Sequence, residues 1–183
     1  MRVRSPRAVP GGAAETGAGR PVRVLPWVGT AVRLLLGVVW VVAGLAKLPD
    51  PAGAERAVRA YQLAPEELVP ALAFGLPVVE IAIGVLLVLG AFVRPVAVAS
   101  ALLLAGFTAA VASAWARGLT IDCGCFGGGG QVDADQTAYL GEIVRDAALL
   151  CGSLLLVARP RTRLALLDRA QPTHREDDHG VER

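Results

Sequence analysis

The chain has 183 residues, of which 54% are hydrophobic and 19% charged, and its mean hydropathy is +0.54. Soluble domains are usually about 45–50% apolar and about 25% charged. Only five of the 34 formal charges lie in the interior of four apolar stretches, each about as long as the roughly 20 residues that cross a bilayer as a helix. The composition excludes a water-soluble enzyme, a small disulfide-stapled secreted protein and a nucleic-acid-binding domain.

The pattern along the chain predicts an all-α protein, an integral membrane four-helix bundle with disordered tails. Residues 1–26 are rich in Arg, Pro and Gly without an apolar period, which is typical of disorder. Residues 27–158 form one transmembrane domain, and a charged tail, 159–183, follows it. The apolar runs predict membrane-spanning helices at about 27–46, 68–91, 94–116 and 139–158. Asp50-Pro51 predicts the start of a short interfacial helix in the first long loop.

The distribution of positive charge predicts the orientation in the membrane. Twelve Arg and Lys residues lie in the two tails and in the turn between the second and third helices, against four in the two longer loops. Cytoplasmic segments carry the excess of positive residues. We therefore expect both termini in the cytoplasm, with loops 47–67 and 117–138 on the opposite side.

The cysteines suggest a thiol–disulfide site. Cys123 and Cys125 flank a glycine in the second long loop, where the compartment favours disulfides, and a bond closing so small a ring is strained and suited to exchange. The alternatives are two unrelated thiols or a metal site, but no metal is expected because the histidines, His174 and His179, are in the cytoplasmic tail. Cys151 lies about 18 Å along the last helix, and we expect it to pack as a small hydrophobe.

Charges inside the predicted spans need partners, because an isolated charge in a bilayer is costly. Arg33 and Glu80 fall at similar predicted depths, and we expect them to pair, either as a structural ion pair or as a polar site for protons or a quinone-like headgroup. Glu142, Arg145 and Asp146 share one helix face. That cluster lies beneath the cysteines, where Arg145 could favour a thiolate; plain interhelical pairing is the alternative.

Three segments resemble the DoxX-type four-helix membrane proteins: Arg33–Gly37, Ala43–Leu48, and the run Val-Val-Glu-Ile-Ala-Ile-Gly that ends at Gly84. The loop Asp122–Gly127 narrows the resemblance to the MauE branch, the methylamine utilisation proteins, over about residues 27–158. The resemblance implies a part in the maturation of methylamine dehydrogenase, whose small subunit needs many periplasmic disulfides, with a thioredoxin-like companion protein. It also implies that Cys123 and Cys125 are the redox pair.

The sequence therefore predicts a bacterial inner-membrane protein, a candidate thiol–disulfide oxidoreductase, whose partners are a thioredoxin-like protein, its client enzyme and the lipid bilayer, and not nucleic acid. No cofactor motif is evident, although electrons that cross the bilayer would need a quinone or another carrier. A second hypothesis is a non-catalytic membrane scaffold that recruits the maturation partner. A small-solute transporter is less favoured, because the chain has no internal repeat or pair of broken helices.

Overall fold

The structure, a computed structural model, describes residues 25–159. Its four long helices are α1 (Leu25–Lys47), α3 (Val69–Leu89), α4 (Val93–Ala116) and α5 (Tyr139–Ala158). Each end of these helices lies within two residues of the predicted span. The predicted disordered tails, 1–26 and 159–183, fall almost wholly outside the described residues.

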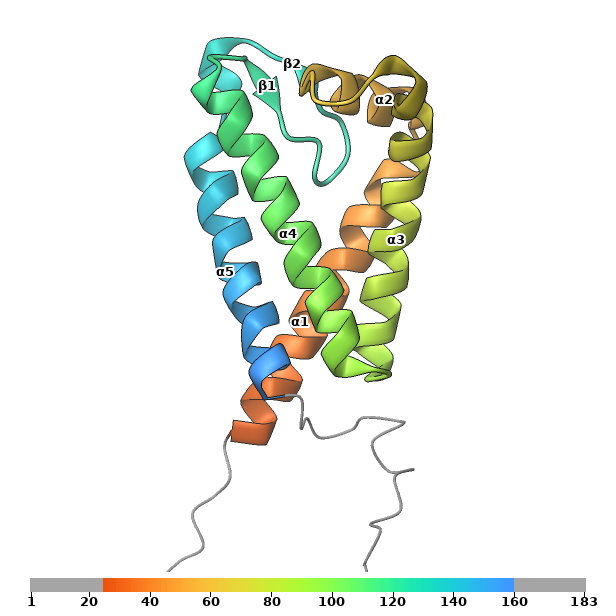
Figure 1. The fold of residues 1–183 in the computed structure, drawn as a ribbon, viewed down its shortest axis with the longest axis vertical. Helices are drawn as coiled ribbons and strands as arrows, with labels where there is room; N and C mark the ends of the chain where they lie inside the picture. Colours follow the sequence, from red (N-terminus) through yellow and green to blue (C-terminus); the bar gives the residue numbers. More distant parts are fainter. Residues whose placement is uncertain (1–24, 160–183) are drawn as a thin grey trace, which may run out of the picture.

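The chain is an all-α membrane protein. Within residues 25–159, three segments are long and apolar enough to cross a membrane: Trp27–Lys47, Glu66–Leu89 and Val93–Ala116. The fourth long helix, α5, lies beside them in the bundle (Figure 1) but carries Glu142, Arg145 and Asp146 in its first two turns. Whether α5 is a fourth membrane span therefore stays a prediction.

Two helix pairs build the bundle, α1 with α3 and α4 with α5. Glycines let the backbones of α1 and α3 meet: a Cβ at Gly84 would lie 2.7 Å from the carbonyl oxygen of Gly37, and one at Gly44 would lie 2.7 Å from that of Pro77. Close approach through small residues is a usual way for helices to associate in lipid. In contrast, α3 and α4 are joined by a tight turn at one end and diverge toward the other (Figure 1).

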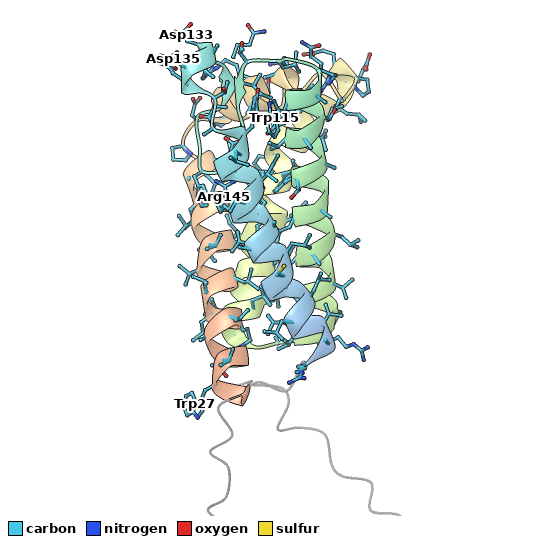
Figure 2. The ribbon with its side chains drawn as sticks, turned by 90° about the vertical axis from the view of Figure 1, so that its left-hand side faces the viewer. Trp27, Trp115, Asp133, Asp135 and Arg145 are labelled. Carbon is cyan, nitrogen blue, oxygen red and sulfur yellow. The ribbon has the colours of Figure 1, made fainter. Side chains whose placement is uncertain are left out.

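The end where α3 and α4 diverge holds the short elements, and we call it the hairpin end. These elements are α2 (Pro51–Ala60), η1 (Glu66–Leu68), β1 (Ile121–Asp122), β2 (Gly130–Gln131) and η2 (Ala134–Gln136). The predicted interfacial helix is confirmed as α2, whose N-terminus is capped by the Asp50 carboxylate at 2.8 Å from the Gly53 N–H. Asp133 and Asp135 lie at this end and Trp27 at the opposite one (Figure 2).

The core divides into two clusters along the bundle axis. The larger one includes Leu36, Trp40, Leu87 and Leu104, and the one nearer the hairpin end includes Val111, Ala114, Ile121 and Tyr139. The Tyr139 hydroxyl donates to the carbonyl of Leu119 and accepts from the Ile121 N–H at 3.0 Å. These bonds fix β1 against α5, so that the loop that follows starts from a rigid position.

The prediction that Cys151 packs inside the bundle is wrong, because its side chain is exposed on the surface of α5. Helical periodicity explains the difference. The buried positions near Cys151 are Asp146, Ser153 and Leu156, which define the inward face of α5. Depth along the helix does not say which face a residue occupies.

Candidate functional site

The loop 123–129 between β1 and β2 turns inward, toward the helices, instead of projecting from the end of the bundle (Figure 1). Gly124 and Gly127 have φ values of 66° and 88°, in the left-handed region that favours glycine. They also pass close to helices: a Cβ at Gly124 would lie 2.9 Å from the Cβ of Ala57, and one at Gly127 would lie 2.7 Å from the carbonyl oxygen of Ala46. Their missing side chains let the loop enter the bundle.

The two loop cysteines lie side by side within this turn. The backbone N–H of Cys125 donates to the sulfur of Cys123 at 3.3 Å. Both are free thiols, and both are half-buried. The sequence assigns the pair to a long loop, and the inward turn of that loop covers the sulfurs with helices. The turn places the two cysteines side by side, joined by this backbone hydrogen bond.

The two thiols differ in pKa. The pKa of Cys125 is lowered, chiefly because its sulfur accepts the Cys123 hydrogen bond, and also because Arg145 and Lys47 are nearby cations; burial and Asp146 oppose this effect. The pKa of Cys123 is raised by donating that hydrogen bond, by burial and by the charges of Cys125 and Glu142. The first thiolate to form is therefore that of Cys125, and the thiolate is the nucleophilic form.

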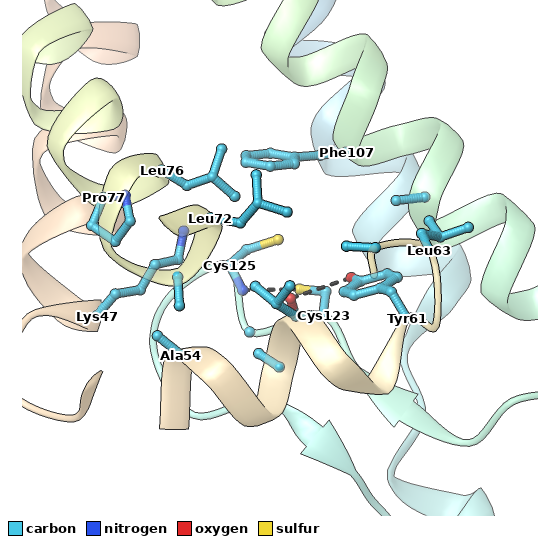
Figure 3. Close-up of a pocket in the computed structure, with 16 residues that line it drawn as sticks. Lys47, Ala54, Tyr61, Leu63, Leu72, Leu76, Pro77, Phe107, Cys123 and Cys125 are labelled. Carbon is cyan, nitrogen blue, oxygen red and sulfur yellow. Dashed lines mark hydrogen bonds between the residues drawn. The ribbon is translucent and has the colours of Figure 1, made fainter. Parts of the chain in front are cut away.

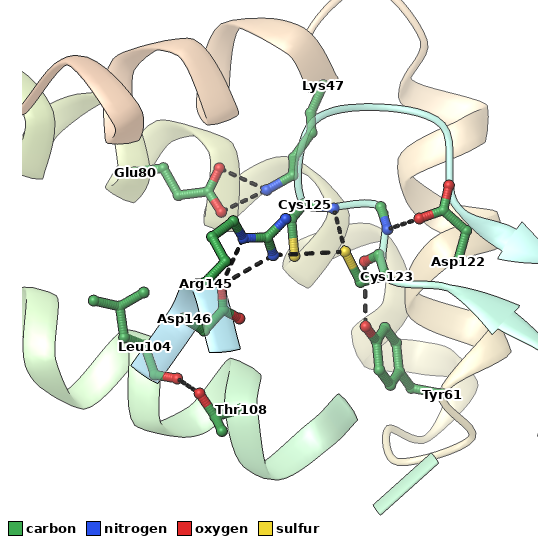
Figure 4. A network of polar contacts seen from close by, with 11 residues as sticks. Lys47, Tyr61, Glu80, Leu104, Thr108, Asp122, Cys123, Cys125, Arg145 and Asp146 are labelled. Carbon is green, nitrogen blue, oxygen red and sulfur yellow. Dashed lines mark hydrogen bonds and ion pairs between the residues drawn. The ribbon is translucent and has the colours of Figure 1, made fainter. Parts of the chain in front are cut away.

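The charged cluster of α5 lies beside the thiols, as the sequence predicts. Arg145 donates from Nε to the Asp146 carboxylate at 2.9 Å, and its Nη2 lies 4.0 Å from the sulfur of Cys123 (Figure 4). Its guanidinium also stacks on the Phe126 ring, 5.1 Å from the ring centroid. The guanidinium is thus held between a carboxylate, a ring and a thiol, so its position next to the sulfurs is fixed.

Glu142 also lies near Cys123. It is 7% exposed, and its Oε2 has no hydrogen-bond partner among residues 25–159. Donor atoms of Asp122, Cys123 and Glu142 lie within 4.8 Å of one another and could hold a metal ion. They would supply three of the four ligands of a zinc site, and a metal bound there would occupy the Cys123 sulfur. The histidines, His174 and His179, lie outside the described residues.

The predicted pairing of Arg33 with Glu80 is wrong. Both carboxylate oxygens of Glu80 bind the Nζ of Lys47, at 2.5 and 2.7 Å. Arg33 donates instead to the carbonyl oxygen of Leu87 at 3.0 Å. Since Leu87 lies seven residues beyond Glu80 in α3, the two side chains differ in depth by about 10 Å at helical rise.

The cause of this error is the stagger between α1 and α3. Gly44 packs at Pro77, and only three residues of α1 follow Gly44, whereas eleven residues from Glu66 precede Pro77. The prediction counts depths in the membrane from the helix ends and assumes that the ends of α1 and α3 are level. Because they are not, it places Glu80 at the wrong depth relative to α1. Lys47, which the sequence assigns to a loop, is the missed residue. The sequence does contain a signal for this pairing: Lys47 ends one apolar run, and Glu80 is the only acid inside the next. A lysine at the end of a helix can reach such an acid because its apolar stem can lie along apolar surface.

Cys125 lies between two cavities. The larger one, about 180 Å³, is bounded by α2, α3, α4 and the cysteine loop, and the smaller one, about 30 Å³, is lined in part by Glu80, Arg145 and Asp146. Figure 3 shows the Cys125 sulfur pointing toward Leu72 and Phe107 in the larger cavity. The arrangement is a dithiol in which the thiol of lower pKa, that of Cys125, has charged groups on one side and an apolar cavity on the other.

Comparison with known proteins identifies a family for the chain. The family model described as "Methylamine utilisation protein MauE" matches residues 25–159, a range that contains all four long helices and the cysteine loop. The methylamine utilization protein MauE of Paracoccus denitrificans is 41% identical over 128 residues, which cover 69% of this chain and 69% of the relative. No solved structure matches. Since the matched region exceeds half of the chain, the protein belongs to the MauE family of methylamine utilisation proteins.

Proposed function

We propose that this protein exchanges disulfides at the extracytoplasmic face of a bacterial inner membrane and so supports disulfide formation in a methylamine dehydrogenase. The observation that carries the proposal is the hydrogen-bonded pair Cys123 and Cys125, in which one thiol has a lowered pKa beside Arg145 and Lys47. For the cysteine pair to face the extracytoplasmic side, both termini must be cytoplasmic and the hairpin end must face outward. The excess of Arg and Lys in the tails supports this orientation. The immediate partner is a thioredoxin-like protein that passes the disulfide to the enzyme.

The pKa difference assigns a role to each sulfur. In the oxidised pair, a partner thiolate attacks the sulfur of Cys123, the S–S bond breaks, and Cys125 leaves as the thiolate because the thiol of lower pKa leaves faster. A second partner thiolate then attacks the mixed disulfide and releases Cys123, which takes up a proton. The partner dithiol loses two electrons and two protons and becomes a disulfide. One proton remains on Cys123, and the other protonates Cys125 or goes to water, according to the pH.

The experiment is to trap the mixed disulfide. In a Cys125→Ser variant, Cys123 can bond to the partner but no second thiol of the pair can resolve the bond. We expect a covalent complex with a thioredoxin-like protein that disappears on reduction, seen by non-reducing electrophoresis and mass spectrometry. Cys123→Ser is expected to trap much less, and Cys151→Ser, which removes the exposed thiol of α5, is expected to change nothing.

The same strains test the scaffold hypothesis. A scaffold would co-purify with its partner without covalent linkage, and the association would survive the double substitution of Cys123 and Cys125. If maturation of the client enzyme also proceeds normally in that double variant, the exchange proposal is wrong. If maturation stops while the protein is still inserted at its normal level, the thiols are required for it.

A further inference from the structure

The larger cavity adjoins a redox-active pair and has no role in the exchange described above. It is half-open, and its wall is almost entirely apolar, formed by side chains such as Leu72, Leu76, Phe107 and Ala110. The polar groups that reach it are few: the sulfurs of the cysteine pair, Lys47 and Tyr61. An apolar cavity with a few polar groups gathered at one place is the usual form of a small-molecule site.

The volume fits one six-membered ring. The cavity measures about 180 Å³, and an apolar cavity of about 150 Å³ in another protein accommodates benzene. Leu72, Phe107 and Cys125 line the same cavity, and the Cys125 sulfur points toward the other two (Figure 3), so a ring bound in the cavity would lie near that sulfur. Packing of an apolar ring against an aromatic side chain adds to its burial.

The position of the cavity selects a lipid-soluble compound. Leu72 and Leu76 belong to the candidate membrane span Glu66–Leu89, and Phe107 and Ala110 to the span Val93–Ala116. The cavity therefore lies between two membrane-competent helices where they diverge (Figure 1). A compound dissolved in the bilayer can reach it, whereas a charged redox cofactor would have to leave water.

Lys47 gives the cavity a polar edge. Its Nζ binds Glu80 at 2.5 Å and lies 5.7 Å from the centroid of the Phe107 ring. An ammonium group held in place near a ring oxygen would stabilise the negative charge that builds up when the ring is reduced. A saturated lipid chain has no oxygen that the ammonium group could stabilise, whereas a quinone ring does.

We propose that this cavity binds the ring of a membrane-soluble p-benzoquinone, which reoxidises Cys123 and Cys125. The inference rests on the proposed function, since it supplies the oxidant that regenerates the disulfide. The two thiols lose two electrons and two protons in total and form one S–S bond. The quinone takes up both electrons and two protons and becomes the quinol.

The test uses the purified full chain with a Cys151→Ala background, so that the cysteine pair holds the only thiols. The reduced protein is mixed without oxygen with decylubiquinone, whose fully substituted ring disfavours thiol addition. Quinone reduction is followed by absorbance, and intact mass reports the loss of two hydrogens from the protein. We expect one quinone reduced for each protein that gains a disulfide.

Two neighbouring alanines of α4 provide matched variants. Ala110 lines the cavity, whereas Ala109 is exposed on the outside of the helix. We expect Ala110→Trp to slow quinone reduction by about tenfold to a hundredfold, because a ring that cannot enter loses the burial of its apolar surface. Ala109→Trp is expected to react as the parent does. If Ala110→Trp does not fold, Leu72→Trp, with exposed Ala71→Trp as its control, makes the same comparison.

Each outcome decides the matter. The inference is overturned if decylubiquinone leaves the parent dithiol reduced, or if the cavity variant and its control react equally fast. If Cys125→Ser still traps the partner in that case, the exchange function stands and only the quinone site is lost. If trapping fails while quinone reduction proceeds, the partner proposal is wrong and the cavity site stands.

Discussion

The Lys47–Glu80 ion pair predicts a large loss of stability when one partner is removed. The Glu80 side chain has no exposed surface and that of Lys47 is 13% exposed, so neither charge is well solvated once it is alone. Breaking a buried pair by removing one member typically costs about 3–5 kcal/mol, whereas replacing both members by apolar groups is often neutral. We therefore expect Lys47→Met to lower the free energy of unfolding by about 3–5 kcal/mol, and the double variant Lys47→Met, Glu80→Leu to recover most of that loss.

The assay is unfolding in mixed micelles of dodecylmaltoside and increasing dodecyl sulfate, followed by circular dichroism. The matched control is Arg59→Met, which removes a cation that pairs with both Glu55 and Glu66, and all three side chains are at least one-third exposed. Solvent-exposed pairs contribute little, so the control should unfold close to the parent. The reasoning is refuted if Lys47→Met costs no more than Arg59→Met, or if the double variant is as unstable as the single one.

Two further predictions concern the cysteine loop. The pKa of Cys125 is lowered, chiefly by the hydrogen bond from Cys123, so alkylation of Cys125 by iodoacetamide, followed by mass spectrometry, should reach half of its maximal rate at a lower pH than that of a free cysteine, whose pKa is about 8.5. In Cys123→Ala the pH profile of this alkylation should move to higher pH. Identical profiles for the parent and the variant would contradict the assignment. Gly127→Ala should destabilise the protein by at least about 1 kcal/mol, because its φ is 88° and its Cβ would lie 2.7 Å from a carbonyl oxygen of α1. Gly128→Ala has a similar φ of 72°, but its Cβ would come no closer than 4.0 Å to a side chain, so a smaller loss in the same unfolding assay is expected, and equal losses would argue against close packing of the loop.

The sequence predicts the helices well because their apolar runs are long and end at strong signals. The Asp50-Pro51 start of α2 and the end of α5 near Arg159 follow from local chemistry that involves only neighbouring residues. The common face of Glu142, Arg145 and Asp146 follows from helical periodicity in the same way. Each of these features depends on contacts within one segment of the chain.

The features that the sequence misses depend on how two segments lie against each other. The stagger of α1 against α3 is set by contacts such as Gly44 with Pro77, and it moves the partner of Glu80 from Arg33 to Lys47. The inward turn of the cysteine loop has the same origin. The glycine-rich stretch after Cys125 has no side chains that could predict what it contacts, and the missing side chains let the backbone pack against α1 and α2.

The charges around the thiols also bear on the direction of electron flow. Lys47 pairs with Glu80 and Arg145 with Asp146, and the two cations lower the pKa of Cys125. The hydrogen bond from Cys123 is the largest contribution that stabilises the Cys125 thiolate, and the two cations add to it against burial and Asp146. The thiolate exists only in the reduced pair, and a disulfide whose reduced form is stabilised is the stronger oxidant. Under the proposed exchange function, this stabilisation favours a pair that takes electrons from a partner dithiol, which is the direction that disulfide formation requires.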